Sequence, residues 1–142
     1  MKKGRVLLAD SHLGMLGGVH SLLEALFENV LMVADERSLI DAVTTFKPDV
    51  VVVDLSLPRE GEVNIARLLM EHNADLRLIV LSVYDEQMVV SQMLSAGVAG
   101  FVLKRAAAVE LVPAIKEVLK GQVYVSAGVQ KDRDQKAGSM KI

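Results

Sequence analysis

Val50-Val51-Val52-Val53-Asp54 is the most informative stretch of this 142-residue sequence. Four consecutive valines are typical of a strand that is buried on both faces, as the central strands of a parallel sheet are. The aspartate follows the apolar run directly, so we expect its carboxylate to lie at the C-terminal end of that strand. Because open α/β sheets bind their ligands at this edge, Asp54 is the first candidate for a functional residue.

Short apolar runs alternate with helical patterns on both sides of the valine strand. Four further runs have the character of strands, and they span residues 5–9, 30–34, 76–81 and 100–103. Apolar residues at helical spacing predict five helices, near residues 13–28, 38–46, 63–72, 85–96 and 109–120. We expect Gly97 to end the fourth helix in a left-handed conformation, and Pro113 to lie within about the first turn of the fifth. If the fifth helix begins earlier, we expect a kink at Pro113.

Strands that alternate with helices of about 10 to 15 residues indicate five β-α units and a parallel sheet with helices on both faces. Right-handed crossovers then make the sheet doubly wound, so the predicted fold class is α/β. A chain of this length is most simply one domain. We expect the fold to occupy residues 1–125, and the polar residues 126–142 to form a tail or the stub of a linker.

Composition excludes several kinds of site and location. The formal net charge is -2, which gives no electrostatic reason to expect a nucleic acid or an anionic membrane as partner. The chain has no cysteine, so disulfides, thiolate catalysis and cysteine–metal sites are impossible. It has no apolar stretch of about 18 residues and no convincing signal peptide, so we expect a cytoplasmic protein that does not span a membrane.

Polar side chains follow the ends of several predicted strands. Asp10 follows the first strand, Asp54 the third, Ser82 the fourth and Lys104 the fifth. The carboxyl ends of parallel strands meet at one edge of the sheet, so we expect these side chains to lie close together. A single aspartate in such a position is more often a helix cap or a turn residue than a functional group. The joint placement of acids, a hydroxyl and an amine is what favours a functional site.

This constellation resembles the receiver domain of two-component response regulators, and the resemblance covers roughly residues 4–125. Three stretches are most similar to the NarL/FixJ type: Ala9-Asp10-Ser11-His12, Asp54-Leu55-Ser56-Leu57-Pro58 and Ala96-Gly97-Val98-Ala99-Gly100-Phe101-Val102-Leu103-Lys104. Each motif is weak alone, and their order and spacing make the match specific. The resemblance implies a flavodoxin-like (CheY-like) fold with strand order 2-1-3-4-5, and a receiver domain over residues 1–125.

The resemblance also implies a mechanism. Asp54 would be the phosphoacceptor, attacking the phosphorus of a phosphohistidine on a partner histidine kinase. Lys104 would neutralise phosphoryl oxygens, and Ser82 would hydrogen-bond the phosphoryl group and draw the loop after the fourth strand inward. Phe101, three residues before the lysine, would be the aromatic residue that changes rotamer in response. Such a protein switches a partner surface, and we expect no enzyme activity from it in the usual sense.

The metal site that the family implies is one carboxylate short in this sequence. Mg²⁺ would be held by Asp10, Asp54 and the backbone carbonyl of Ser56, with water and phosphate oxygens in the remaining positions. In the family the first strand is usually followed by two acidic residues, but here the second is Ser11, whose hydroxyl is a weak ligand. We therefore expect weakened Mg²⁺ affinity and slower phosphorylation.

Two functions of different classes remain open. The first is a phosphorylatable receiver within a transcription regulator, and the second is a degenerate receiver that acts as a phosphorylation-independent interaction or dimerisation module. A flavin-binding protein or a haloacid-dehalogenase-like hydrolase is a weaker third alternative. The hydrolase class needs Asp-x-Asp after its strand, whereas this chain has Asp10-Ser11-His12. A flavin site usually recruits aromatic residues to stack on the ring, and this chain has only two tyrosines, three phenylalanines and no tryptophan.

The same resemblance suggests further partners. Receivers of this type commonly precede a helix-turn-helix DNA-binding domain, and the polar residues after Ala127 are too few to form one. We therefore expect no DNA contact from this chain itself. The sequence is compatible with a fragment of a transcription regulator whose full-length protein carries such a domain, and equally with a single-domain protein. Burial in a homodimer would fit the apolar positions of the last helix, although core packing alone explains most of them: Leu111, Val112, Ile115, Val118 and Leu119.

Overall fold

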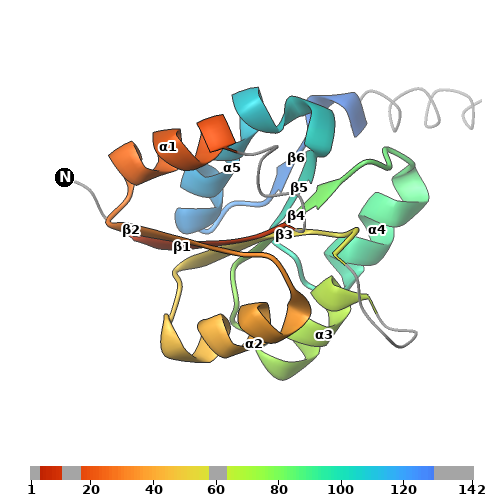
Figure 1. Ribbon diagram of the computed structural model, residues 1–142. Helices are drawn as coiled ribbons and strands as arrows, with labels where there is room; N and C mark the ends of the chain where they lie inside the picture. The colour runs from red at the N-terminus through yellow and green to blue at the C-terminus, as the bar shows by residue number, and fades with distance from the viewer. Residues whose placement is uncertain (1–3, 11–16, 58–63, 130–142) are drawn as a thin grey trace, which may run out of the picture.

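The computed structural model describes residues 4–10, 17–57 and 64–129. Within these residues, parallel strands form one sheet in the order β2-β1-β3-β4-β5-β6 (Figure 1). The strands are β1 (Arg5–Ala9), β2 (Asn29–Val33), β3 (Val50–Asp54), β4 (Leu78–Ser82), β5 (Gly100–Leu103) and β6 (Tyr124–Val125). The predicted order 2-1-3-4-5 is confirmed, whereas the predicted number of five strands is corrected by β6, which adds a sixth at the edge next to β5.

Helices connect successive strands and cover both faces of the sheet. They are α1 (Gly17–Leu26), α2 (Glu36–Thr45), α3 (Ile65–His72), α4 (Gln87–Ser95) and α5 (Ala107–Leu119), and a 3₁₀ turn, η2 (Lys104–Ala106), leads into α5. Figure 1 shows α1 and α5 on one face of the sheet, and α2, α3 and α4 on the other. None of these described helices is long and apolar enough to cross a membrane.

The valine strand separates two hydrophobic cores. Val50 and Val52 belong to the core under α1 and α5, whereas Val51 and Val53 belong to the core under α2, α3 and α4. This division follows from the strand itself, because successive side chains point to opposite faces of a sheet. All five residues of β3 are buried. Complete burial of one valine side chain contributes about 1.5–3 kcal/mol, so this strand holds both helical layers against the sheet.

Short polar side chains begin two of the helices, and a glycine follows a third. Asp35 caps α2 by accepting a hydrogen bond from the backbone N–H of Ser38 at 2.8 Å, and Asn64 caps α3 in the same way through Arg67 at 2.9 Å. The hydrogen bonds from Ser38 hold the pKa of the Asp35 carboxyl below its ordinary value. Gly97 follows α4 with a φ of 102°, which confirms the predicted left-handed end.

The last helix begins earlier than the sequence pattern indicated. It starts at Ala107 rather than near Val109, and Pro113 is its seventh residue, so the prediction that Pro113 lies in the first turn is wrong. Alanine has the highest helix propensity, and consecutive alanines extend the helix toward β5. Pro113 removes one intrahelical donor. The buried apolar face of α5, to which Ile115 belongs, packs against the sheet and compensates for that loss.

The folded part of the chain extends past the predicted boundary at residue 125. Ser126 and Val129 are fully buried, and Val129 belongs to the same hydrophobic core as Phe101 of β5. A strand of two residues is too short for its alternation to be recognised in a sequence, and Val129 is a single apolar residue beside a polar stretch. The described packing therefore reaches residue 129, and the position of the domain boundary stays a prediction. Residues 130–142 of the predicted tail lie outside the described residues.

Gly100 is required by the close approach of β5 to β4. A Cβ placed there would lie 2.9 Å from Cγ1 and 3.3 Å from Cγ2 of Ile79, which is fully buried and, being β-branched, has few other rotamers. We therefore expect Gly100→Ala to lower the free energy of unfolding by about 1–3 kcal/mol, the usual cost of overpacking a core. Urea unfolding followed by circular dichroism measures this change, and an unchanged midpoint would contradict it.

Tyr124 of β6 is hydrogen-bonded to α5, because its hydroxyl donates to Oε1 of Glu110 at 2.9 Å. Burial, together with the hydrogen bond and the negative charge of Glu110, raises the pKa of Tyr124 to about 12. The folded-state pKa thus lies above the unfolded value of about 10. The contribution of this residue to stability is therefore fully present below about pH 10 and is lost as the pH rises toward about 12.

An absorbance titration of the phenolate tests the shifted pKa of Tyr124. The chain has two tyrosines, so Tyr84→Phe leaves Tyr124 as the single chromophore of this kind. We expect its titration midpoint near pH 12 in the folded protein, and a lower midpoint once Glu110→Gln removes the neighbouring charge. A midpoint near pH 10, with the circular dichroism spectrum still native, would show that the environment of Tyr124 is not the one described.

Candidate functional site

Four polar side chains lie at the carboxyl ends of neighbouring strands. Asp54 and Ser82 are the last residues of β3 and β4, whereas Asp10 and Lys104 come directly after β1 and β5. Parallel pairing runs in register up to this edge of the sheet, which brings the strand ends side by side. Asp10, Asp54 and Ser82 are at most 1% exposed. Buried polar groups are uncommon in proteins, so their concentration here marks the edge as a candidate site.

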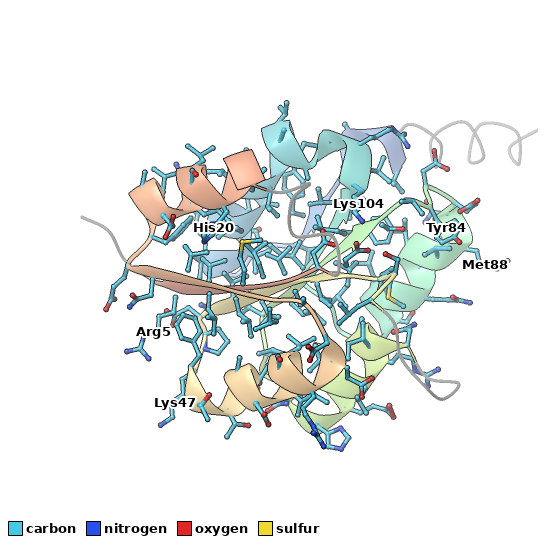
Figure 2. The ribbon with its side chains drawn as sticks, in the orientation of Figure 1. Arg5, His20, Lys47, Tyr84, Met88 and Lys104 are labelled. Carbon is cyan, nitrogen blue, oxygen red and sulfur yellow. The ribbon has the colours of Figure 1, made fainter. Side chains whose placement is uncertain are left out.

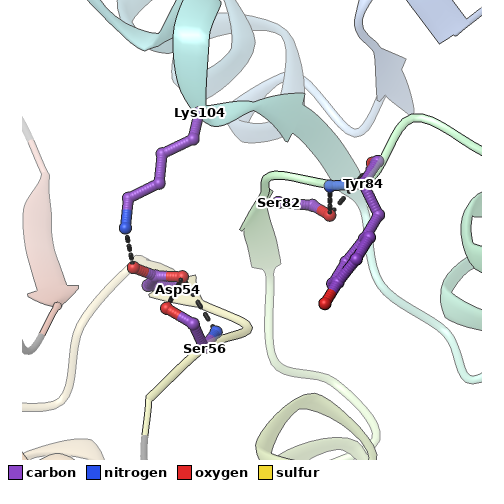
Figure 3. Close-up of polar contacts among 5 residues, drawn as sticks. All are labelled: Asp54, Ser56, Ser82, Tyr84 and Lys104. Atoms are coloured by element: carbon purple, nitrogen blue, oxygen red, sulfur yellow. Dashed lines mark hydrogen bonds and ion pairs between the residues drawn. The ribbon is translucent and has the colours of Figure 1, made fainter.

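Lys104 and Asp54 form an ion pair across the sheet edge (Figure 3). The Nζ atom of Lys104 donates a hydrogen bond to Oδ2 of Asp54, and the lysine reaches it from the first residue of η2. The lysine side chain is 11% exposed and the carboxylate 1%, so the pair is largely removed from water. Each charge therefore depends on the other for compensation, since an unpaired buried charge is strongly unfavourable.

Ser56 contacts the other carboxylate oxygen of Asp54. Its backbone N–H donates to Oδ1 at 2.9 Å, and its hydroxyl donates to the same oxygen at 2.8 Å (Figure 3). The sequence predicts a role only for the carbonyl of Ser56, as a metal ligand, and neither of these two hydrogen bonds is among the predictions. The Asp-x-Ser spacing could have indicated them, because aspartate often accepts from the residue two positions later in a turn. The carboxylate of Asp54 is thus held through both of its oxygens.

The surroundings of Asp54 keep its carboxyl group ionised. Burial raises the pKa of Asp54, but the hydrogen bonds from Lys104 and Ser56 lower it by more, so the net pKa lies below its ordinary value. An ionised and oriented carboxylate can act as a nucleophile or as a metal ligand. The ammonium group beside it can neutralise an anion that binds at the same edge.

The hydroxyl of Ser82 is engaged with the loop that follows β4. It donates a hydrogen bond to the carbonyl oxygen of Tyr84 at 3.0 Å and accepts one from the backbone N–H of Tyr84 at 2.9 Å (Figure 3). Phe101, on neighbouring β5, is fully buried. The contact of Ser82 with a phosphoryl group and the rotamer change of Phe101 stay predictions.

Two carboxylates at this edge are suited to a metal ion. Asp10 is fully buried and follows β1, the strand that pairs with the one ending in Asp54. Mg²⁺ usually takes one or two carboxylates and keeps several waters, so this donor set fits it. Among the described residues, no group of three or more histidine or acidic side chains could hold a metal ion. Ser11, the predicted weak ligand, lies outside the described residues.

Known proteins with similar sequences belong to one family. The sequence matches the response regulator receiver domain over residues 6–116. It is 33% identical over 127 residues to the response regulator UvrY of Escherichia coli (strain K12), covering 87% of this chain and 58% of that protein. It is 30% identical over 125 residues to the transcriptional regulatory protein DegU of Brevibacillus brevis, covering 87% of this chain and 53% of that protein. The chain thus spans about half the length of these curated relatives.

Solved structures of response regulators have the same architecture. The RcsB response regulator of Salmonella typhimurium superposes with a TM-score of 0.82 at 26% sequence identity, over 92% of this chain and 67% of that one. The non-phosphorylated receiver domain of the stress response regulator RcsB from Escherichia coli superposes with a TM-score of 0.76 at 26% identity, over 87% of this chain and 98% of that one. The chain therefore belongs to the receiver-domain family of response regulators, and its relatives are those of the LuxR/NarL type.

Proposed function

We propose that this chain is the phosphoacceptor receiver domain of a two-component response regulator, and that Asp54 is the residue that is phosphorylated. The observation that best supports this is the buried Asp54 carboxylate, held by Lys104 on one oxygen and by Ser56 on the other. One carboxylate oxygen attacks the phosphorus of a phosphohistidine on a partner kinase, and the P–N bond breaks. The histidine nitrogen keeps the electron pair and takes a proton from solvent, which leaves an aspartyl phosphate.

Lys104 supplies a fixed positive charge for this reaction. Phosphoryl transfer depends mainly on positioning and on neutralising charge at the transferred oxygens. At roughly 4 Å and an effective dielectric constant near 20, an ammonium group and one negative charge attract each other by about 4 kcal/mol before desolvation. The lysine already contacts Asp54, so little reorganisation is needed when the phosphoryl group arrives.

Mg²⁺ supplies further positive charge when it is bound, and receiver domains generally bind it at the phosphorylation site. We propose Asp10, Asp54 and the backbone carbonyl of Ser56 as the ligands from this chain. Ser11 stands where the family usually has a second acid, so the chain brings one carboxylate fewer to the metal. Weak Mg²⁺ binding and slow phosphorylation are the expected consequences.

We propose that the loop after β4 transmits the response to a partner. Ser82 holds Tyr84 through two hydrogen bonds, and a bond from Ser82 to the phosphoryl group would replace at least one of them. Val83, Tyr84 and Met88 are 60%, 58% and 70% exposed, so a movement of this loop changes an apolar surface. Figure 2 shows Tyr84 and Met88 on the same side of the molecule. A rotamer change of the buried Phe101 would make room for the inward movement.

The wider role of the protein is proposed from its relatives. DegU is named a transcriptional regulatory protein, and one solved structure contains RcsB dimers bound to DNA. We propose that this receiver takes its phosphoryl group from a sensor histidine kinase, within a cytoplasmic transcription regulator that can form a homodimer. DNA contact would then come from a separate domain. Response regulators are generally not classical enzymes, and the only reaction that we propose for this chain is its own phosphorylation.

Incubation of the chain with Mg²⁺ and acetyl phosphate tests this proposal. We expect intact mass spectrometry to show the gain of one phosphoryl group, with a rate that still rises at high Mg²⁺ concentration because the metal site is weak. Chelation with EDTA should stop the reaction. A folded chain that gains no mass at high Mg²⁺ would overturn the proposal in favour of a phosphorylation-independent interaction module, which the relatives described above do not support.

A further inference from the structure

Ser126 ends the pairing of β5 with β6 through its side chain. Its backbone N–H donates to the carbonyl oxygen of Phe101 at 2.9 Å, but its own carbonyl oxygen accepts from the N–H of Val129 at 3.1 Å, in the turn that follows β6. The next N–H of β5 that points toward β6 belongs to Leu103, and it donates to Oγ of Ser126 at 3.2 Å instead of to a backbone carbonyl. The serine hydroxyl thus takes the place of the backbone acceptor that a continuing parallel strand would offer.

Glu110 of α5 fixes the direction of that hydroxyl. Oγ of Ser126 donates to Oε1 of Glu110 at 2.7 Å, which leaves its lone pairs available to the N–H of Leu103. Ser126 is fully buried and Leu103 is 2% exposed, so water does not compete for these bonds. Buried backbone donors are nearly always paired in proteins. An apolar residue at position 126 would therefore disturb the backbone of β5 at Leu103.

The bond to Leu103 lies one residue from the lysine of the site. Leu103 is the last residue of β5, and Lys104 begins η2 and reaches Asp54 from there. On its other side the end of β5 pairs with Ser82 of β4. The backbone just before Lys104 is therefore fixed on both sides, by pairing with β4 on one side and by the hydrogen bond to the Ser126 hydroxyl on the β6 side.

We propose that Ser126, oriented by Glu110, is a positioning residue that holds Lys104 against the phosphorylation site. The inference deepens the function proposed above and rests on it, since the position of Lys104 matters only if the lysine acts on the phosphoryl group. Ser126 acts through the backbone at Leu103 and not by direct contact with the reacting atoms. Ser126, which follows β6, then belongs to the phosphorylation site of the receiver rather than to a tail.

Ser126→Ala is the direct test, and Tyr124→Phe is its matched control. Tyr124 also donates to Oε1 of Glu110 from the same edge of the sheet, but this bond does not support Leu103. At saturating Mg²⁺ we expect Ser126→Ala to slow labelling by acetyl phosphate by about tenfold, as the loss of one buried hydrogen bond would. Tyr124→Phe should change the rate by less than about twofold. Equal labelling rates for the two variants would overturn the inference.

A double-mutant cycle distinguishes positioning from a merely structural role. In a Lys104→Ala chain the group to be positioned is gone, so adding Ser126→Ala is expected to leave the remaining labelling rate within about twofold. A structural role would slow labelling by the same factor with and without the lysine, and that result would overturn the inference. Circular dichroism and thermal unfolding show whether each variant is folded.

A second pair of variants covers the case in which Ser126→Ala does not fold. Glu110→Gln keeps an acceptor oxygen for the serine hydroxyl and should label nearly as fast as the parent chain, whereas Glu110→Ala should label several-fold more slowly. Equal rates for this pair would overturn the inference. A parent chain that is never labelled overturns the proposed function together with this inference, whereas a labelled parent and an equally fast, folded Ser126→Ala variant overturn this inference alone.

Discussion

Asp54→Asn is expected to abolish phosphoryl labelling of the chain by acetyl phosphate. The amide has nearly the shape of the carboxylate but lacks the anionic oxygen that attacks phosphorus. Its oxygen can still accept a hydrogen bond from Lys104, so the fold should persist. Intact mass spectrometry over a time course, with Mg²⁺ in one arm and EDTA in the other, measures the result.

Asp35→Asn is the matched control for this loss. Asp35 also follows a strand, β2, at the same edge of the sheet, but its side chain caps α2 through Ser38. Asparagine caps a helix about as well as aspartate, so the chain should stay folded and labelling should not change. Labelling that survives Asp54→Asn, or that is lost in Asp35→Asn, would show that the acceptor has been assigned to the wrong aspartate.

The strands that position Asp54 and its neighbours could be predicted because they are buried on both faces of the sheet. Such strands have to be continuous apolar runs, so their ends are visible in the sequence without any knowledge of their neighbours. The predicted runs at Arg5–Ala9 and Gly100–Leu103 have the bounds of β1 and β5. The polar residues that end or follow these strands are then assigned to one edge of the sheet by topology alone, which is how Ser82 and Lys104 were identified.

The contacts within the site could not be predicted in the same way. Ser82 bonds to Tyr84 because of loop geometry and a rotamer that have no periodic signal in the sequence. The two hydrogen bonds from Ser56 to Asp54 have only the local Asp-x-Ser spacing as their signal. Ser126 is a stronger example, since its partners on β5 and α5 are 23 and 16 residues away along the chain. Its role depends on the pairing of a two-residue strand, and a serine near a polar terminus gives no indication of that pairing.

Ser11→Asp is expected to tighten Mg²⁺ binding by about a hundredfold. Outer-shell residues alone change metal affinity by 10- to 100-fold, and a carboxylate that ligates directly should do at least as much. Mg²⁺ keeps several waters and takes few ligands from a protein, so each carboxylate accounts for a large share of its affinity. Asp10, Asp54 and Lys104 give the site two acidic side chains and one basic one, and the substitution adds a third acidic side chain.

Ser11→Asn is the control, because it matches aspartate in size but adds no charge, and it should bind Mg²⁺ about as weakly as the parent chain. Calorimetric titration with Mg²⁺ measures affinity, and labelling rates over a range of Mg²⁺ concentrations then separate affinity from chemistry. If the missing acid limits only metal binding, the rates of the parent and Ser11→Asp chains converge at saturating Mg²⁺. Equal Mg²⁺ affinity for all three chains would show that position 11 does not limit the site. In that case slow labelling would have to come from poor alignment of Lys104 with Asp54. We propose that Ser126 maintains this alignment through its hydrogen bond to Leu103.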